Sequence, residues 1–381
     1  MPKLYDIQEK PKRVMLVSLL NGKADDEQKA NELEGLCKTL SLDIIAHEKV
    51  RIREKSSRFG IGSGKAESLS QKACELAADL MIFDFNPSPS QQRNWEELSG
   101  IPAIDRQELI IRIFAERAAT REAELQVKLT ELTYFLPRLS HKYIDLSRQR
   151  GGRYGTRGAG ETKLETDRRK VEKRITQLEK EIEQVRKQRQ NQRRLRERGN
   201  TAVCAIVGYT NAGKSSLLNV LTGSDVPAED KFFATLDAVT RRFSPAPGFN
   251  VLLTDTVGFI RDLPHALIKA FHSTLEEVLL ADILIHVLDA SDTGIENNYE
   301  TTIRVLRELG AGGIPVITLL NKIDRLNEND EMQELKNRFP GSIQVSAKTG
   351  AGLDALKEMI VQIRKKILLG MEAEKIKDEL L

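Results

Sequence analysis

Short apolar runs separated by stretches with helical patterning dominate the first hundred residues. The runs are residues 14–20 (VMLVSLL), 42–46 (LDIIA), 79–85 (DLMIFDF) and 101–104 (IPAI). Runs of this length, each followed by an amphipathic stretch, are typical of buried strands alternating with helices. The pattern therefore predicts a small parallel α/β unit over residues 1–105.

A long helical pattern follows. Asp105 can cap a helix together with Glu108, and no Pro or Gly interrupts the chain before Pro137, so we expect one long helix. Its leucines give a stripe that packs on another helix. A second stripe has heptad-like spacing and dense flanking charge, which predicts an antiparallel hairpin over residues 106–198. The two stripes are Leu125, Leu129, Leu132 and Leu136, and Leu164, Val171, Ile175, Leu178, Ile182 and Val185.

Between the two stripes lies RQRGGRYGTRGAGETK, residues 148–163. Its five glycines and five basic residues favour neither helix and cannot form a core. We expect an exposed loop at the tip of the hairpin.

The third part of the chain begins after the basic run RRLRERGN (193–200). TAVCAIVG has the pattern of a buried strand that enters a glycine loop, and strand and helix patterns alternate to about residue 366. This predicts a doubly wound α/β domain over residues 199–367. The polar tail, residues 368–381, carries no motif.

Composition excludes several classes of protein. The 381 residues predict two or three domains, and no apolar run approaches the roughly 18 residues of a membrane span. The N-terminal ten residues lack the apolar core of a secretion signal, and KDELL has one leucine too many for a retention signal, so we expect a cytosolic protein. We also expect it to be a monomer in solution. Cys37, Cys74 and Cys204 show no ligand-like spacing with histidines, which argues against disulfides and structural zinc.

Positive charge is concentrated in the predicted hairpin. Residues 138–198 hold 20 Lys or Arg against 9 Asp or Glu, a net charge of +11, whereas the whole chain is only +3. This favours a polyanionic partner such as RNA, with contacts from the tip loop, although a solvated coiled coil would show the same charge. The proposed contacts are Arg148, Arg150, Arg153, Tyr154 and Arg157.

GYTNAGKS matches the phosphate-loop pattern and follows a strand and precedes a helix, as that motif requires. A chance glycine turn is the alternative. Backbone N–H groups at the helix start can bind phosphate oxygens, Lys214 can neutralise the β and γ phosphates, and Ser215 can ligate Mg²⁺. The residues assigned to nucleotide binding here are Gly208, Tyr209, Thr210, Asn211, Ala212, Gly213, Lys214, Ser215 and Ser216.

Two further segments carry the predicted switches. In DTVG, Asp255 is placed to hold Mg²⁺ through water, and the Gly258 N–H can approach the γ-phosphate. Thr235 is the candidate for the switch hydroxyl that completes the metal shell, and Thr240 is the competing choice. Lys214, Thr235 and Gly258 are therefore the predicted catalytic residues.

Guanine specificity is indicated by NKID and SAKTG. Asp324 can accept both the ring N–H and the exocyclic amine of guanine, a donor pair that adenine lacks. Asn321 would brace the loops, Lys322 would cover the base, and the Ala347 N–H would meet the guanine O6. Ser346 and Lys348 complete this set.

Phe259 follows Gly258 where many small GTPases have a glutamine that orients the attacking water. We therefore expect slow intrinsic hydrolysis and a partner that completes the site. Asn211 could hold a monovalent cation such as K⁺, or simply make loop hydrogen bonds. GAGETK and FGIGSGKAES (59–68) are too incomplete to be second nucleotide sites.

The chain resembles the HflX-type GTPases, a ribosome-associated branch of the P-loop GTPases. The resemblance spans most of the chain and is carried by residues 82–98, 113–139, RGAGETKLETDRR (157–169), and FFATLDAVTRR beside DTVGFI. It implies an α/β N-terminal unit with a helical hairpin, a Ras-like G domain, and GTP-dependent binding to the large ribosomal subunit and its rRNA. It also implies a role in splitting stalled or idle ribosomes, with residues 148–160 reaching toward the peptidyl transferase region. Some relatives extend well beyond the G domain, whereas this chain stops soon after its last predicted helix.

Together these features predict an Mg²⁺-dependent GTPase that binds the ribosome and is reset by hydrolysis. One alternative is a GTPase of RNA modification or subunit assembly, whose target would be a tRNA or a precursor particle. Another is a regulator whose hairpin binds a protein or an anionic membrane surface.

Overall fold

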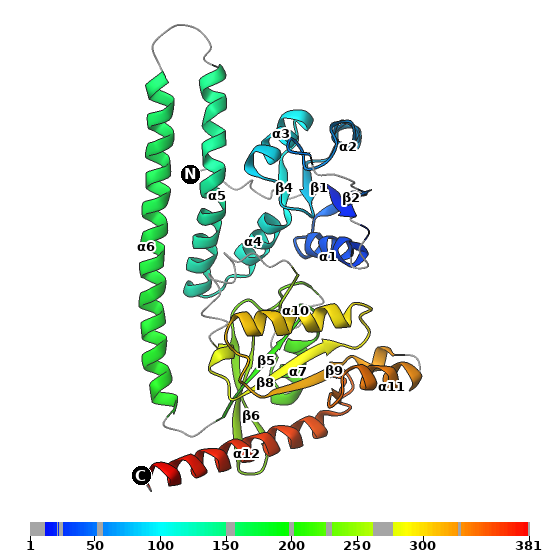
Figure 1. Cartoon of the computed structure of the whole chain (residues 1–381), viewed down its shortest axis with the longest axis vertical. Helices are drawn as coiled ribbons and strands as arrows, with labels where there is room; N and C mark the ends of the chain where they lie inside the picture. Colours follow the sequence, from blue (N-terminus) through cyan, green and yellow to red (C-terminus); the bar gives the residue numbers. More distant parts are fainter. Residues whose placement is uncertain are drawn as a thin grey trace. The chain divides into compact units, whose positions relative to one another are not determined.

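The computed structural model describes residues 12–20, 22, 26–51, 56–149, 157–197, 202–225, 231–261, 277–326 and 329–379. The chain divides into two compact units (Figure 1). The first comprises Met1–Glu116 and Glu124–Glu183, and the second Arg117–Ala123 and Gln184–Leu381. Both are α/β, as the sequence predicts.

The first unit contains a four-stranded parallel sheet in the order β2-β1-β3-β4. Strand β1 is completely buried over residues 14–17, which explains its continuous apolar run. The prediction of a small parallel α/β unit is confirmed. Its elements are β1 (Arg13–Leu20), α1 (Asp26–Thr39), β2 (Asp43–Arg51), α2 (Ser63–Glu75), β3 (Leu80–Phe83), α3 (Pro89–Ser99), β4 (Ala103–Asp105) and α4 (Arg106–Arg117).

The glycine-rich segment 59–68 serves this core. Phe59 is buried against Trp95, with ring centroids 5.5 Å apart, and its carbonyl accepts the indole N–H at 3.0 Å. The segment then turns into α2 at Ser63. The packing of Phe59 on Trp95 thus accounts for the conformation of this segment.

The expected single long helix after Asp105 is wrong, because two helices form. The first, α4, ends at Arg117, and α5 (Arg121–Gln149) starts after a break. Thr120 caps the new helix by accepting the Ala123 N–H at 3.2 Å. The helix then continues through Pro137 to Gln149, so this proline does not end it.

The tip loop is shorter than expected from residues 148–163. Residues up to Gln149 belong to α5, and α6 (Arg157–Glu197) begins at Arg157, so the glycines at 158 and 160 are helical. Helix formation tolerates isolated glycines at a cost of about 1 kcal/mol each, which long flanking helices can offset. Among the proposed RNA contacts, Arg150, Arg153 and Tyr154 lie outside the described residues. The backbones of Arg148 and Arg157 lie at the ends of the two helices.

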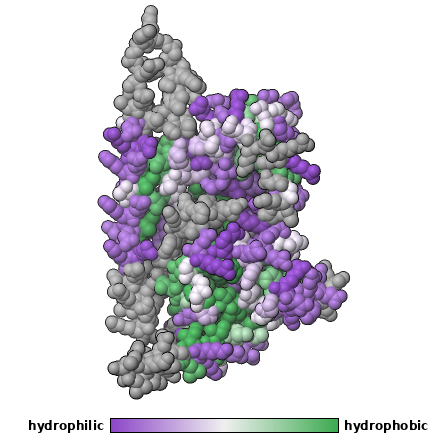
Figure 2. Space-filling view, viewed as in Figure 1, coloured by the Kyte–Doolittle hydropathy of each residue, from purple (hydrophilic) through white to green (hydrophobic). Residues whose placement is uncertain are grey.

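The hairpin pairs two long helices (Figure 1). Leu178, in the middle of the second apolar stripe, is completely buried, as a helix–helix seam requires. Figure 2 shows a narrow hydrophobic stripe along the hairpin beside hydrophilic side chains. None of the described helices is long and apolar enough to cross a bilayer.

Arg138 attaches α5 to the sheet of the first unit. Its guanidinium binds Asp105 at 3.0 Å and Gln92 at 3.1 Å, and it lies 3.6 Å from the centroid of the Tyr134 ring. Because Asp105 is completely buried, the pair is shielded from solvent. The middle of α5 is therefore held firmly on this unit.

The second unit contains a six-stranded sheet in the order β10-β9-β8-β5-β7-β6, parallel except for β6. The helix α12 continues through much of the segment predicted as a tail. The elements are β5 (Ala202–Gly208), α7 (Lys214–Thr222), β6 (Val239–Ala246), β7 (Phe249–Asp255), β8 (Ile283–Asp289), α10 (Ile295–Glu308), β9 (Val316–Asn321), η1 (Ile323–Arg325), α11 (Asn329–Arg338), β10 (Ile343–Gln344) and α12 (Leu353–Glu379).

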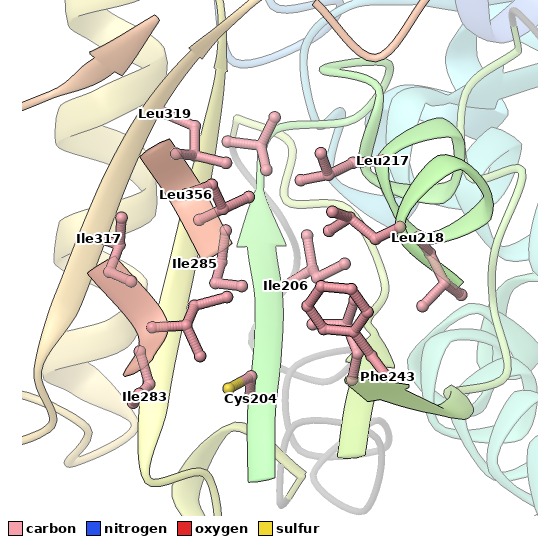
Figure 3. Packing of buried hydrophobic residues seen from close by; sticks show 14 of the residues in the cluster. Cys204, Ile206, Leu217, Leu218, Phe243, Ile283, Ile285, Ile317, Leu319 and Leu356 are labelled. Atoms are coloured by element: carbon pink, nitrogen blue, oxygen red, sulfur yellow. The ribbon is translucent and has the colours of Figure 1, made fainter. Parts of the chain in front are cut away.

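The core of this unit surrounds the central strand β5 (Figure 3). Ile206 on that strand, Leu217 on α7 and Leu356 on α12 are completely buried. Packing on both faces fixes the carboxyl end of β5, from which the glycine loop leaves.

Candidate nucleotide site

The glycine loop joins β5 to α7 and depends on two glycines. Gly208 has φ +147°, and a Cβ there would lie 2.3 Å from the Val287 carbonyl oxygen. Gly213 has φ +90°, and its Cβ would lie 2.4 Å from Asn321 Nδ2. Other residues would clash at both positions, so the loop conformation requires glycine. The first turn of α7 is thereby presented as an anion-binding end.

A pocket of about 220 Å³ lies over this loop. It is lined by the loop, by the segment around Thr235, and by residues after β7 and β9. Its lining residues are Thr210, Asn211, Gly213, Lys214, Ser215, Ser216, Lys231, Phe233, Ala234, Thr235, Thr256, Gly258, Lys322 and Arg325.

Lys214 is buried at the floor of the pocket. Its ammonium donates to the Tyr209 carbonyl oxygen at 2.7 Å. Burial lowers its pKa to about 8, while Asp255 opposes this shift and Lys322 adds to it. A phosphate would supply the negative charge that this buried cation needs.

Three side-chain oxygens converge beside Lys214. Ser215 Oγ donates to Asp255 Oδ2 at 2.6 Å, and Thr235 Oγ1 donates to the same oxygen at 2.9 Å. The two hydroxyls are 2.8 Å apart. Thr240, the competing choice, instead contacts Thr254 Oγ1 at 3.0 Å on the neighbouring strand. The structure thus brings Thr235, and not Thr240, to Ser215 and Asp255.

The segment after β7 is held against the glycine loop. Phe259 N–H donates to the Gly208 carbonyl at 3.0 Å, and its carbonyl accepts the Thr210 N–H at 2.8 Å. A Cβ on Gly258 would lie 2.8 Å from both Thr210 Cα and Lys214 Nζ. Only glycine lets this segment approach Thr210 and Lys214 this closely.

Phe259 itself is buried in a hydrophobic cluster with Val207 and Leu284. Its ring therefore cannot take the place of a water-orienting glutamine, which agrees with the reasoning from the sequence.

The predicted base-binding residues after β9 and β10 contact one another, and Lys322 among them lines the pocket. Asn321 donates to the Ala212 carbonyl at 2.9 Å and accepts the Ala347 N–H at 3.0 Å, so it braces two loops. Because the Ala347 N–H already donates to Asn321, a guanine O6 would have to share this donor. Ser346 Oγ donates to Asp324 Oδ1 at 2.5 Å, and this bond lowers the pKa of the exposed Asp324 carboxyl.

Lys322 bridges the base end and the phosphate end. It has φ +63°, and its ammonium binds Asp289 at 2.6 Å and the Asn211 carbonyl at 2.7 Å. Asp289, at the end of β8, was not among the residues predicted from the sequence. The signal for it there was its position directly after an apolar run. Lys348 is exposed near Asp324, whose pKa it helps to lower.

Three family models match consecutive parts of the chain. Residues 27–115 match "GTP-binding GTPase N-terminal", residues 117–196 "GTP-binding GTPase Middle Region" and residues 203–322 "50S ribosome-binding GTPase". Similar curated proteins include GTPase HflX of Akkermansia muciniphila, 46% identical over 94% of this chain and 86% of that protein, and GTPase HflX of Escherichia coli K12, 38% identical over 94% and 84%. The chain belongs to the HflX family of GTPases. It is therefore a hydrolase that converts GTP to GDP and phosphate.

A solved structure has the same fold over most of its length. It is the GDP complex of the protein SsGBP, 25% identical, with a TM-score of 0.50, covering 94% of this chain and 99% of that one. The HflX-family assignment and the P-loop architecture thus agree.

GTPases of this kind generally use Mg²⁺, and the residues present fit that ion. Asp255 Oδ1 is buried and has no hydrogen-bond partner within the described part of the chain, although its sister oxygen accepts two bonds. Burial raises the pKa of this carboxyl, while Lys214 and the two hydroxyls oppose the shift. Oxygen donors are the ligands Mg²⁺ prefers, so Ser215, Thr235 and Asp255 would hold it.

Tyr209 contributes a contact that motif reasoning missed. Its phenol oxygen accepts the Arg261 N–H at 2.9 Å, and its ring is buried. The motif pattern leaves this position open, so only the side-chain packing reveals the contact. Tyr209 therefore joins the phosphate loop to the segment after Gly258.

Proposed function

We propose that this HflX-family GTPase binds the large ribosomal subunit in its GTP form and splits stalled or idle ribosomes, and that hydrolysis resets it. Such a protein works in the cytosol. The observation that supports a nucleotide-controlled switch is that Thr235 and Gly258 both line the pocket that holds Lys214. A γ-phosphate there would contact both segments at once.

The residues of the site divide the chemistry between them. Lys214 and the N–H groups at the start of α7 stabilise the charge on the transferred phosphoryl group. Mg²⁺, when bound, neutralises charge on the β and γ phosphates. Gly258 offers its N–H to the γ-phosphate, and Asp324 selects guanine. Because Phe259 is buried, hydrolysis is slow until a partner supplies a further group.

Ribosome binding is supported by the description of the model that matches residues 203–322, "50S ribosome-binding GTPase". The charge distribution adds to this support. Residues 165–187 hold 8 basic and 6 acidic residues, whereas residues 138–164 hold 7 and 2. Four charged pairs within α6 further neutralise its middle: Arg168–Glu172, Arg169–Glu165, Lys170–Asp167 and Arg174–Glu181. The unbalanced charge therefore lies toward the ends of α6 and the hairpin tip.

We infer that the tip contacts rRNA through Arg148, Arg150, Arg153, Tyr154 and Arg157. Arginines bind phosphates, and an aromatic ring stacks on unpaired bases, which suits irregular RNA.

The test compares two variants of equal charge. One replaces the four tip arginines with alanine, and the matched control replaces Arg168, Arg169, Lys170 and Arg174, which are paired within α6. Binding to large ribosomal subunits is measured with a non-hydrolysable GTP analogue over a range of salt concentrations. We expect the tip variant to bind at least about 10-fold more weakly, with a salt slope reduced by about 3, and the control to lose much less. Equal losses would contradict the tip contacts.

Asn211 remains our proposed contact for a monovalent cation. It has φ +62° and lies on the pocket rim. GTP hydrolysis measured in K⁺ and in Na⁺ tests this, and equal rates would remove the proposal.

A further inference from the structure

Residues 117–123 cluster with the second unit although the residues on both sides belong to the first. Asp237 explains this placement. Its Oδ2 accepts the N–H groups of Ala119 at 3.2 Å and Thr120 at 3.1 Å, and its Oδ1 accepts the Thr120 hydroxyl at 2.5 Å. The same hydroxyl accepts the Ala123 N–H at 3.2 Å.

Asp237 thus lies at the N-terminus of α5, where the helix dipole favours negative charge. Thr120 uses its hydroxyl both as donor and as acceptor, and so serves as cap and as anchor together. Residues 119 and 237 are 118 positions apart in sequence. This carboxylate therefore replaces the helical hydrogen bonds that α4 and α5 would make if they were continuous.

Asp237 is only two residues from Thr235. Leu236, which lies between them, is 3% exposed. Phe233, which precedes Thr235, is 2% exposed and has φ +55°. The short segment is thus fixed at one end by the bond from Thr235 to Asp255 and at the other by Thr120. Only the buried Leu236 separates the two anchored residues, so one end has little freedom to move without the other.

We propose that Asp237 is a positioning residue for Thr235, and that the start of α5 is the anchor that holds Asp237. It follows that binding of the γ-phosphate and order at the start of α5 are coupled. The coupling is reciprocal, so an anchor that strengthens triphosphate binding is itself stabilised by the triphosphate to the same degree. The inference rests on the proposed role of Thr235 in holding Mg²⁺.

The coupling also gives the switch a route to the hairpin. Further along α5, Arg138 binds Asp105 and Gln92. One continuous helix therefore carries the Asp237 anchor at its start and the attachment to the first sheet in its middle. The nucleotide would reach the hairpin through this helix.

Affinities of the full chain for GDP and for a non-hydrolysable GTP analogue, both with Mg²⁺, test the proposal. Thr120→Val removes the hydroxyl at nearly constant shape, and Asp237→Asn removes the charge. We expect both variants to bind the analogue about 5-fold or more weakly and GDP within about 2-fold, because only the analogue engages Thr235. Thr120→Ser keeps the hydroxyl and should restore the affinity.

Two control variants match these changes. Thr133→Val removes a hydroxyl of the same helix that donates to the Leu129 carbonyl at 2.8 Å. Asp354→Asn neutralises an exposed aspartate in the first turn of α12. Neither should alter the ratio of the two affinities.

Hydrogen exchange provides a readout that needs no ribosome. The amides of Ala119 and Thr120 should exchange more slowly with the analogue than with GDP, and Asp237→Asn should remove the difference. Equal protection in both nucleotide states of the unaltered protein would overturn the coupling.

The outcomes separate this inference from the proposed function. If Thr235→Ala leaves analogue affinity unchanged, the metal role of Thr235 fails. If Thr235→Ala weakens the analogue but Thr120→Val and Asp237→Asn do not, the anchor is overturned. Equal loss of both nucleotides in the anchor variants would show a purely structural role and would also overturn it.

Discussion

The phenol oxygen of Tyr209 accepts the backbone N–H of Arg261 at 2.9 Å, which joins the phosphate loop to the chain that follows Gly258. The Arg261 side chain in turn reaches Asn298 on α10 at 3.3 Å. Because Phe259 is buried and supplies no catalytic group, the position of this segment depends on the backbone and on Tyr209.

Tyr209→Phe should therefore slow GTP hydrolysis and spare GDP binding. Loss of one hydrogen bond, worth about 1 kcal/mol, predicts a fall in kcat of roughly 3- to 10-fold. Single-turnover hydrolysis and GDP titration measure the two effects. Unchanged turnover would show that the phenol does not position the switch.

Nucleotide affinity should depend on pH through Lys214. Its pKa is about 8 when the site holds no phosphate, and a bound phosphate raises it. Above that pH, nucleotide binding is accompanied by uptake of a proton. Nucleotide affinity is therefore highest below about pH 8 and falls by up to about 10-fold for each pH unit above it. Calorimetry of GDP binding between about pH 6.5 and 9, in buffers of different ionisation enthalpy, measures both effects. If the affinity for GDP did not change over this pH range, the lowered pKa of the Lys214 ammonium would be contradicted.

His286 should make the protein sensitive to acid. It is completely buried, neither ring nitrogen has a hydrogen-bond partner among the described residues, and it stacks on Tyr299 at 5.3 Å. Burial, with a smaller effect of Lys214, lowers its pKa to about 3. The unfolded chain binds the proton first as pH falls below about 6.5, so the free energy of unfolding decreases from there toward pH 3.

His286→Phe keeps the stacking and removes this titration. From pH 7 to pH 5 the unaltered protein should lose about 2 kcal/mol more unfolding free energy than the variant. Urea unfolding at the two pH values measures the difference. Parallel losses would mean that His286 is protonated in the folded state.

Asp324→Asn should change the base that is bound. An amide offers a donor where the carboxylate accepts the exocyclic amine of guanine, so GDP affinity should fall by about 100-fold or more. Xanthine has a carbonyl at that position and should bind the variant better than guanine does. Competition between GDP and XDP checks this, and retained preference for GDP would exclude Asp324 as the base reader.

Sequence patterns predicted the strands well because buried parallel strands are continuous apolar runs, as in residues 14–17 and 202–208. They placed the phosphate loop because Gly208 and Gly213 are required by local backbone geometry. These features depend on neighbours in sequence, so the sequence displays them directly.

The break before α5 could not be predicted, because its cause, Asp237, lies more than a hundred residues away. The hydrogen bond of the Tyr209 phenol and the burial of the His286 ring likewise depend on tertiary structure. Choosing Thr235 over Thr240 from sequence was possible by motif order, but the hydrogen bond to Asp255 is visible only in the folded chain. The helical glycines at 158 and 160 were missed because local propensity is weaker than the continuation of a long helix.

Sucrose-gradient sedimentation with whole ribosomes tests the central claim most directly. The chain is mixed with ribosomes and GDP, GTP or a non-hydrolysable GTP analogue, and its position in the gradient is followed. We predict that with the analogue it sediments with large subunits and the whole-ribosome peak decreases, while with GDP it stays near the top. Nucleotide-controlled ribosome binding would be contradicted if the protein sedimented with ribosomal particles equally in all nucleotide states. It would also be contradicted if the protein sedimented with them in no nucleotide state.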